Sequence, residues 1–404
     1  MRDEFRDKAR PEESGRCSYL REREMNRQVL EELLSIARDP YSMLRAWKEG
    51  KKRKIIGSTL VDVPEELIHA AGMWPFTILG TNKPIVKANT HLPDNACSQA
   101  RSDLELVLTY QRDFFDGYVL PQVDDTTQHL SDIWRRDVGW DYFEGFLLPR
   151  QVDRPSARGW LLDETLRLKK SLESFAGKEI SEGRLWKSIG IYNQNRQHLR
   201  HLYEMKRRYP GFISNRHLFD VIKSSMWWPK EEHNHLLERF ISSIEETDLR
   251  ETEEEGIRVV LSGIVWEPPE IMDILDESGL NVVGDDLCVG WRYIGSDIQV
   301  NGNPLNAIVD RHFRKGPFTP IYDKGDKIFE NLLNLVTRNR AEGVIYLHIK
   351  FNESQDFDLP DLVENMDKEG IPIFVVETEY QTTHLAGIRT RIQAFGESLA
   401  RKYA

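Results

Sequence analysis

The chain has 404 residues, of which 40% are hydrophobic and 30% are charged, as is typical of a globular protein of two or three domains. Its 55 basic and 66 acidic residues give a net charge of −11, which argues against general nucleic-acid binding, since that needs a basic face. No apolar run approaches the ~20 residues of a membrane span, there is no secretion signal, and three cysteines make no disulfide framework, so we expect a cytoplasmic protein.

The first part of the chain is a polar, helical segment followed by strands that alternate with helices. The N-terminal extension (1–54) contains the amphipathic stretch NRQVLEELLSIARD. Strands that alternate with helices imply βαβ units and a mainly parallel sheet, which places a first α/β domain at 55–150. Apolar runs predict its strands at 54–63, 76–80, 117–121 and 145–149, and helical patterns lie between them at 64–72, 97–115 and 127–137.

The middle of the chain has helical periodicity and no strand pattern, and the alternation returns after it. Residues 151–255 are predicted to be a helical insert that ends in the charged connector EETDLRETEEEG. A second α/β domain follows at 256–404. The expected fold class is therefore α/β, with two Rossmann-like (flavodoxin-like) parallel-sheet domains, a helical insert and a helical N-terminal extension. The second domain has predicted strands at 257–266, 281–286, 343–351 and 371–380, and predicted helices at 268–279, 327–339, 358–370 and 385–399.

Several familiar catalytic motifs are absent from the sequence. It has no GxGxxG after a strand, no GxxxxGK[ST] and no GxSxG, which argues against a nicotinamide site, a P-loop ATPase and a serine hydrolase. The tripeptide HNH (233–235) lies within a helical pattern. Because His233 and His235 point to different sides of such a helix, we expect both to be solvated.

Position in the fold identifies the candidate site better than any motif. Ligands of open α/β sheets bind beyond the carboxyl ends of the strands. Leu60 ends the first strand, Cys97 opens a helix, and Asn352 follows a strand of the second domain, so we expect the three to meet in one cleft. At a helix start Cys97 is expected to favour a thiolate, which suits a ligand or nucleophile, with a buried apolar role as the equal alternative. Cys17, in the polar N-terminal segment, is expected to be incidental.

From about residue 40 onward the sequence resembles the 2-hydroxyacyl-CoA dehydratase/benzoyl-CoA reductase family, with matching segments in the same order. The resemblance implies a subunit of a two-subunit catalytic core, which accepts an electron from an ATP-hydrolysing iron–sulfur activator. Such cores reduce or dehydrate an acyl-CoA thioester by ketyl-type radical chemistry. The first half carries it in IIGSTLVDVPEELIHAAGMWPFTILG, LPDNACSQARSDLELVL and DGYVLPQVDDTTQHLSDIW, and the second half in LSGIVWEPPEIMDILDESGLNVVGDDLCVGWRY, GVIYLHIKF and EGIPIFVVETEYQTTHLAGIRTRIQAF.

The resemblance also implies a [4Fe–4S] cluster held by three cysteines, of which this sequence retains one. The corresponding positions are Leu60, Cys97 and Asn352. Leucine cannot ligate iron, and an asparagine amide is a poor ligand for a cluster that prefers thiolate. We therefore expect the cluster to lie in a paralogous partner subunit. Cys97 is the one retained candidate ligand, and Leu60 and Asn352 are expected to belong to a substrate cleft.

The segment GDDLCVGWRY (284–293) contains the third cysteine. Cys288 does not correspond to a cluster position, and we expect it to be structural or to line the cleft. Asp285 and Asp286 are expected to fix this loop by charge-assisted hydrogen bonds with Arg292.

In sequence, this loop and the chain's C-terminal segment resemble benzoyl-CoA reductase core subunits more than they resemble the dehydratases. The predicted function is therefore ATP-coupled, radical reduction of an aromatic acyl-CoA by a benzoyl-CoA reductase-like complex of which this chain is a core subunit. The alternatives are a subunit of a 2-hydroxyacyl-CoA dehydratase, or a cluster-less, non-catalytic partner that shapes the active-site cleft. The sequence assigns no catalytic acid or base.

Overall fold

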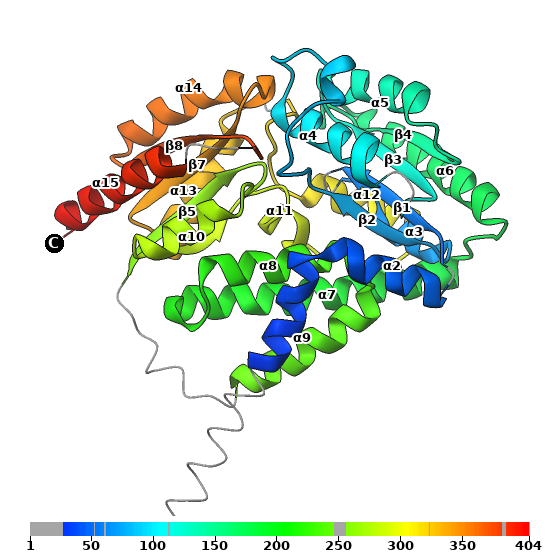
Figure 1. Ribbon diagram of the computed structural model, residues 1–404, viewed down its shortest axis with the longest axis horizontal. Helices are drawn as coiled ribbons and strands as arrows, with labels where there is room; N and C mark the ends of the chain where they lie inside the picture. Colours follow the sequence, from blue (N-terminus) through cyan, green and yellow to red (C-terminus); the bar gives the residue numbers. More distant parts are fainter. Residues whose placement is uncertain are drawn as a thin grey trace, which may run out of the picture.

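The computed structural model describes residues 27–51, 53–59, 62–111, 114–245, 256–322, 324–381 and 385–403. Two of the residues discussed above, Cys17 and Leu60, lie outside these ranges. The chain forms two four-stranded sheets of parallel strands with helices packed around them (Figure 1). The expected α/β class with two parallel-sheet units is therefore confirmed.

The first sheet has the strand order β2-β1-β3-β4. Its inner strands are buried along their length, which explains why they read as continuous apolar runs rather than as alternating patterns. Helix α5 starts with a capping box formed by Asp124 and Thr127. The strands are β1 (Ile55–Thr59), β2 (Trp74–Ile78), β3 (Gly117–Gln122) and β4 (Phe143–Leu147), and the helices are α3 (Glu65–Ala70), η1 (Ala88–Thr90), α4 (Ser98–Leu106), η2 (Val107–Gln111) and α5 (Asp125–Asp137).

The second sheet repeats this order as β6-β5-β7-β8. The predicted final helix is present, and Ile392 and Leu399 of its apolar stripe are fully buried. The strands are β5 (Ile257–Gly263), β6 (Leu280–Asp285), β7 (Gly343–Ile349) and β8 (Ile373–Thr378). The helices are α10 (Glu270–Glu277), α11 (Trp291–Ile294), α12 (Pro304–Arg314), α13 (Lys327–Asn339), α14 (Glu353–Lys368) and α15 (Leu385–Tyr403). Sequence analysis identified neither α11 nor α12.

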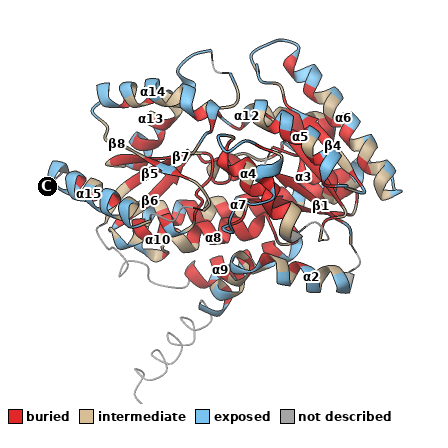
Figure 2. Ribbon diagram, turned by 45° about the horizontal axis from the view of Figure 1, so that its top comes forward, coloured by how far each residue is buried: buried red, intermediate tan, exposed pale blue. Residues whose placement is uncertain are grey.

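Helices fill the described part of the chain between the two sheets. Figure 1 shows α7, α8 and α9 beneath both sheets, and α7 packs against α3 on one side and against β6 on the other. Buried residues are concentrated in the strands of both sheets and in α7 and α8 (Figure 2). These helices are α6 (Ala157–Ala176), α7 (Glu182–Arg208), η4 (Pro210–Phe212), α8 (Asn215–Ser225) and α9 (Lys230–Glu245), with α2 (Pro40–Lys51) and a helix over 27–38 beside them.

The expectation that the HNH histidines are solvated is wrong for His233. Its side chain is fully buried on α9, where Nδ1 accepts from the Asn195 amide at 2.8 Å and Nε2 lies 2.9 Å from the Ser224 hydroxyl. Burial lowers the pKa of His233 well below its ordinary value, so the neutral ring serves as a core hydrogen-bonding group. Among the described helices, none is long and apolar enough to cross a membrane.

Candidate functional site

In each sheet the chain order reverses at one point, and the two points come together. The reversals lie between β1 and β3 in the first sheet and between β5 and β7 in the second. At such a point the two connecting segments run to opposite faces of the sheet. The carboxyl ends of the two strands are therefore open to a ligand. The backbone N–H of Ser98, at the start of α4, donates to the carbonyl of Lys350, just after β7, at 3.1 Å. We call the group Cys97, Ser98, Lys350 and Asn352 the junction.

Two of the three residues expected to converge are in contact at the junction. The amide Nδ2 of Asn352 donates to the Sγ of Cys97 at 3.6 Å, and both side chains are buried. The third residue, Leu60, directly follows Thr59, the last residue of β1, but lies outside the described residues. The structure thus brings together the two residues that it describes.

Cys97 is the N-cap residue of α4, as the sequence indicated, but its thiol does not favour the ionised form. Burial raises the pKa of Cys97, and the hydrogen bonds from the backbone of Ala100 and from Asn352 only partly oppose it. Asp124, at the end of β3, also raises this pKa through its negative charge. The expected thiolate is therefore wrong, because desolvation outweighs the helix terminus.

Asn352 caps helix α14 and holds Cys97 with the same side chain. Its Oδ1 accepts from the backbone N–H of Gln355 at 3.0 Å, which leaves Nδ2 for the sulfur. Helix α14 begins at Glu353, five residues before the predicted start at 358, because Asn352 supplies the cap. The preceding residue, Phe351, has a φ of 61°, a conformation that a bulky residue rarely adopts.

A second contact joins the two sheet regions beside the junction. The side-chain amide of Gln381, after β8, donates to the carbonyl of Thr81 at 2.6 Å and lies 3.2 Å from the Ser102 hydroxyl. Ser102 itself accepts from the backbone N–H of Thr81 at 2.8 Å. Residues of α4 and of the segment after β2 are thus tied to residues that follow β7 and β8.

A buried carboxyl lies next to the end of β1 and was not identified from the sequence. Burial raises the pKa of Asp103 well above its ordinary value, although the side chains of Gln99 and Thr59 hydrogen-bond to it. Thr59 also hydrogen-bonds to the hydroxyl of Tyr118. The polar face formed by Gln99 and Asp103 at positions i and i+4 of α4 was the available signal. This arrangement can keep a proton on Asp103 beside the strand end.

The residues at the junction do not fit a three-cysteine iron–sulfur site. Cys97 is the single thiol there, Asn352 uses its amide for the sulfur and the helix cap, and leucine has no donor atom. In the part of the chain that the structure describes, no three His, Cys, Asp or Glu side chains are grouped so as to hold a metal ion. The described residues of the junction thus offer one thiol, where a cluster of this kind takes three thiolates.

The loop with Cys288 is held differently from what its sequence suggested. Asp285 accepts from the backbone N–H groups of Leu287 and Trp291 at 3.0 and 2.7 Å, and from the Tyr203 hydroxyl at 2.5 Å. Cys288 is fully buried, and its backbone N–H donates to Ile264 at 2.9 Å.

The expected pairing of Arg292 with the neighbouring acids is wrong. Arg292 extends instead to Asp62 in the loop after β1, where Nη2 lies 3.5 Å from Oδ1. Asp286 accepts from the Ser262 hydroxyl at 3.2 Å and from the Gly263 backbone N–H at 3.3 Å. The acidic partner of Arg292 therefore lies 230 positions away in the sequence.

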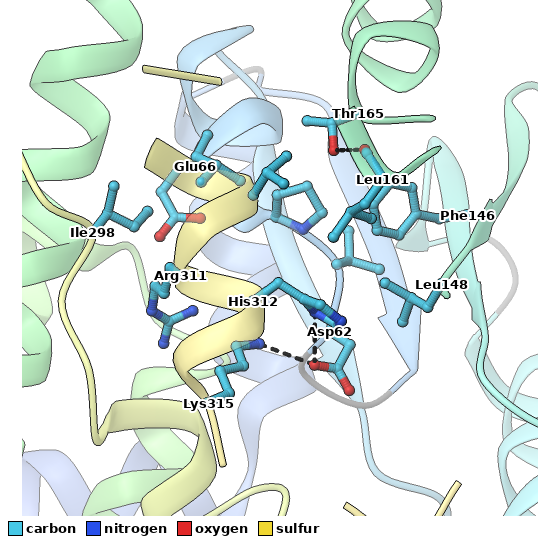
Figure 3. Close-up of a pocket in the computed structure, with 14 residues that line it drawn as sticks. Asp62, Glu66, Phe146, Leu148, Leu161, Thr165, Ile298, Arg311, His312 and Lys315 are labelled. Carbon is cyan, nitrogen blue, oxygen red and sulfur yellow. Dashed lines mark hydrogen bonds and ion pairs between the residues drawn. The ribbon is translucent and has the colours of Figure 1, made fainter. Parts of the chain in front are cut away.

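Arg292 belongs to a buried ion cluster around the loop between β1 and α3. The Lys315 ammonium lies 3.0 Å from Asp62, and Arg196 of α7 pairs with Glu66. Figure 3 shows His312 and Lys315 beside Asp62, with Arg311 on the opposite side of the same helix. We call the group the ion cluster; its members are the acids Asp62, Glu65 and Glu66 and the bases Arg196, Lys230, Arg292, Arg311 and Lys315, all buried.

The electrostatics of the ion cluster follow from burial and mutual pairing. Burial alone raises the pKa of Asp62, but Lys315, Arg292 and His312 together hold it below its ordinary value. Burial likewise opposes ionisation of Glu66, but Arg196 and Arg311 lower its pKa to about 2. Burial lowers the pKa of Lys315 to about 8 against the pull of Asp62. Asp62 and Glu66 thus stay ionised at neutral pH.

The cavity beside the ion cluster is too small for a thioester substrate. It measures about 30 Å³ and is lined by Asp62, Glu66, Arg311 and Lys315 on one side and by apolar residues such as Phe146 and Leu161 on the other. One or two water molecules occupy such a volume, whereas ligand sites span roughly 300–1,000 Å³. The ion cluster therefore fixes the loop that follows β1 rather than binding substrate. The three acids in VDVPEE directly after an apolar strand were its sequence signal.

Comparisons with known proteins agree over most of the chain. The model of the family "2-hydroxyglutaryl-CoA dehydratase, D-component" matches residues 60–399. The chain is 28% identical over 373 residues to the beta subunit of lactoyl-CoA dehydratase from Anaerotignum propionicum, covering 92% of this chain and 98% of that protein. It is 26% identical over 364 residues to the (R)-phenyllactyl-CoA dehydratase beta subunit of Clostridium sporogenes, covering 90% and 96%. It is 25% identical over 366 residues to one of the benzoyl-CoA reductase subunits of Thauera aromatica, covering 89% and 94%.

Proposed function

The chain belongs to the 2-hydroxyglutaryl-CoA dehydratase D-component family, and from this premise we propose that it is a core subunit of an enzyme complex that acts on an acyl-CoA thioester. Its relatives are subunits of dehydratase and benzoyl-CoA reductase complexes. The proposed reaction is the ATP-coupled radical reduction of an aromatic acyl-CoA, with a paralogous core subunit and an ATP-hydrolysing iron–sulfur activator as partners. The C-terminal segment and the loop at 284–293 support the reductase assignment.

The hydrogen bond between Asn352 and Cys97 supports the second part of the proposal, which concerns the subunit that holds the cluster. The resemblance to the family implies a cluster at this place. In this chain the Asn352 amide hydrogen-bonds to the buried thiol of Cys97, and Leu60 occupies the third position. We assign the [4Fe–4S] cluster to the partner subunit. This chain is then the cluster-less subunit that shapes the shared active site.

In this arrangement the junction and its surroundings form one wall of the substrate cleft. Leu60 supplies apolar surface at the end of β1. The amide of Asn352, once released from Cys97, donates a hydrogen bond to a thioester carbonyl. Cys288 supports this wall from behind Ile264 and binds no iron. Cys97 stays the single candidate ligand of the chain.

Dehydration of a 2-hydroxyacyl-CoA is the second candidate reaction. Two of the relatives given above are dehydratase beta subunits, at 28% and 26% identity, against 25% for the reductase subunit. These identities are nearly equal and do not separate the two reactions, both of which use a CoA thioester.

One experiment separates these possibilities. The chain is purified anaerobically, alone and together with a paralogous core subunit and the activator, and is assayed with ATP, a low-potential electron donor and either benzoyl-CoA or a 2-hydroxyacyl-CoA. We expect turnover of one substrate class by the complex and none by the isolated chain. Turnover by the isolated chain, or none by any complex with either substrate class, contradicts the proposal.

A further inference from the structure

A surface groove lies at the carboxyl ends of β3 and β4 and shares Leu148 with the cavity beside the ion cluster. Its walls come from the ends of these strands, at Gln122 and Leu148, and from the segment that leads into α6, with Arg150, Arg154 and Trp160. Its volume is about 460 Å³, which falls in the range of roughly 300–1,000 Å³ that ligand sites occupy. Carboxyl ends of parallel strands are where open α/β sheets bind ligands.

The groove has an exposed aromatic ring at its outer end. Trp160, in the first turn of α6, is 54% exposed, although tryptophan is normally one of the most buried residues of a chain. Leu147, at the end of β4, is 39% exposed on the same groove. An exposed indole flanked by apolar surface is a stacking platform for a planar ring.

The groove is also positively charged, in a chain whose net charge is −11. Arg150 and Arg154 line it, and no aspartate or glutamate does. The guanidinium of Arg150 lies 3.4 Å from the Gln128 amide oxygen, a neutral partner, and no described residue forms an ion pair with Arg154. Two arginines that form no ion pair with a described residue lie here beside an aromatic ring. This combination suits a phosphorylated nucleotide.

One end of the groove lies at the carboxyl end of β3. Gln122 is the last residue of β3, and Asp124 follows it by two positions. Asp124 lies close enough to Cys97 to raise the pKa of its thiol. A ligand with a nucleotide head and a long flexible arm would therefore lie with its head at Trp160 and its arm directed along the strand ends.

We propose that this groove binds the adenosine 3′,5′-diphosphate end of a CoA thioester. The adenine stacks on Trp160, the phosphates contact Arg150 and Arg154, and the pantetheine arm passes Leu148 and Gln122 toward the junction. The proposal rests on the proposed function, since it takes the ligand class from there, and it assigns a place for that ligand on this chain.

A neighbouring groove supplies a matched control. It shares Arg150 with the first groove and measures about 520 Å³, but Asp326, Asp358 and Asp361 line it. Phosphates are repelled by such a lining, so the nucleotide prefers the first groove. Phe357, which is 75% exposed in the second groove, is therefore the aromatic control for Trp160.

Calorimetric titration of the full-length chain with CoA, dephospho-CoA and pantetheine tests the proposal. We expect CoA to bind best and pantetheine worst. Trp160→Ala should weaken CoA binding roughly 5- to 100-fold, the range that base–aromatic stacking spans, and Trp160→Phe should restore most of the affinity. Arg150→Gln with Arg154→Gln should abolish the preference for CoA over dephospho-CoA. Phe357→Ala and Arg401→Gln, an exposed arginine of α15, should leave binding unchanged.

The outcomes separate this proposal from the proposed function. If CoA binds Trp160→Ala and the double arginine variant as tightly as the parent chain, the groove is not its site, although the complex can still turn over acyl-CoA. If the parent chain binds no CoA at millimolar concentration, the proposal is also overturned. Binding through the groove with no turnover by any complex would leave this proposal standing and contradict the proposed function.

Discussion

The Nδ2 of Asn352 donates a hydrogen bond to the Sγ of Cys97 at 3.6 Å, across 255 positions of sequence. This contact joins the helix that follows β2 to the helix that follows β7, and so couples the two sheets at their open ends. Both residues are N-cap residues, and the side chain of Asn352 caps α14 by accepting from the backbone N–H of Gln355. The contact thus lies at the termini of two helices.

Asn352→Cys is expected to form a disulfide with Cys97 under mild oxidation. The two side chains already touch, so a shorter thiol side chain in place of the amide needs little movement of the backbone. Non-reducing electrophoresis with peptide mapping measures the cross-link. The control, Asn352→Cys with Cys97→Ala, should show none, and a cross-link from the introduced thiol to any other cysteine would contradict the contact.

The parent chain is expected to bind iron weakly or not at all after anaerobic reconstitution. One thiolate cannot hold a cluster that needs three, so exogenous thiols should remove it. Leu60→Cys with Asn352→Cys should raise the iron and sulfide content toward about four of each per chain, and adding Cys97→Ala should abolish the gain. Near-stoichiometric iron in the parent chain, lost on Cys97→Ala alone, would show that the chain holds its own cluster.

Glu66→Gln is expected to lower the free energy of unfolding by about 3–5 kcal/mol. The change leaves Arg196 buried without its charge partner, and such an unpaired charge is costly. Replacing both, as Glu66→Leu with Arg196→Met, should cost clearly less because neither charge of this pair is left without the other. Urea titrations at pH 7 measure both variants, and equal losses in the two would argue against a charge effect.

The chain is expected to lose stability in acid partly through Glu66. Its pKa is about 2 in the folded protein against 4.5 for an unperturbed glutamate, so the unfolded chain binds a proton first as the pH falls. The contribution is fully present above about pH 5 and disappears toward pH 2. It amounts to roughly 3 kcal/mol, to order of magnitude. The free energy of unfolding measured from pH 7 to pH 3 should fall less steeply in Glu66→Gln, and parallel curves would contradict this assignment.

Gly57→Ala and Gly190→Ala should change stability in opposite directions. A methyl group at Gly57 in β1 would lie 2.5 Å from the ring of Tyr118, so the variant is expected to lose about 1–3 kcal/mol. Gly190 is exposed within α7 and has no atom within 4 Å of such a methyl group, so alanine there should add about 0.5–1 kcal/mol. Thermal melting measures both changes.

The sequence predicted the sheets well because their strands are buried on both faces. Runs such as KIIGST and GVIYLHI read as continuous apolar segments, and glycine or proline marks many of their ends. Helix α12 has a recognisable start in the sequence, since Asn303 caps it and Pro304 occupies its first turn. Helix α11 has four residues and shows no periodicity to detect.

The candidate site was predictable only where topology determines it. The rule for open sheets placed Cys97 and Asn352 together, because Asn352 follows a strand and Cys97 opens a helix. The partner of Arg292 was not predictable, since two adjacent acids suggested a local pair and the actual partner, Asp62, is remote in sequence. The burial that raises the pKa of Cys97 was likewise not predictable, because it depends on tertiary packing that leaves no local pattern in the sequence.

The ion cluster has a consequence for the order in which the chain is completed during synthesis. Asp62 and Lys315 are separated by 253 positions, and Glu65 meets Tyr293 across 228. When the ribosome has released the first sheet and α6, the three acids after β1 still lack most of their partners. Glu66 gains its partner Arg196 when α7 emerges, whereas Asp62 gains its partners Arg292 and Lys315 only with α11 and the end of α12. Closing so long a loop is slow, and the C-terminal half acts as the step that locks the first sheet in place.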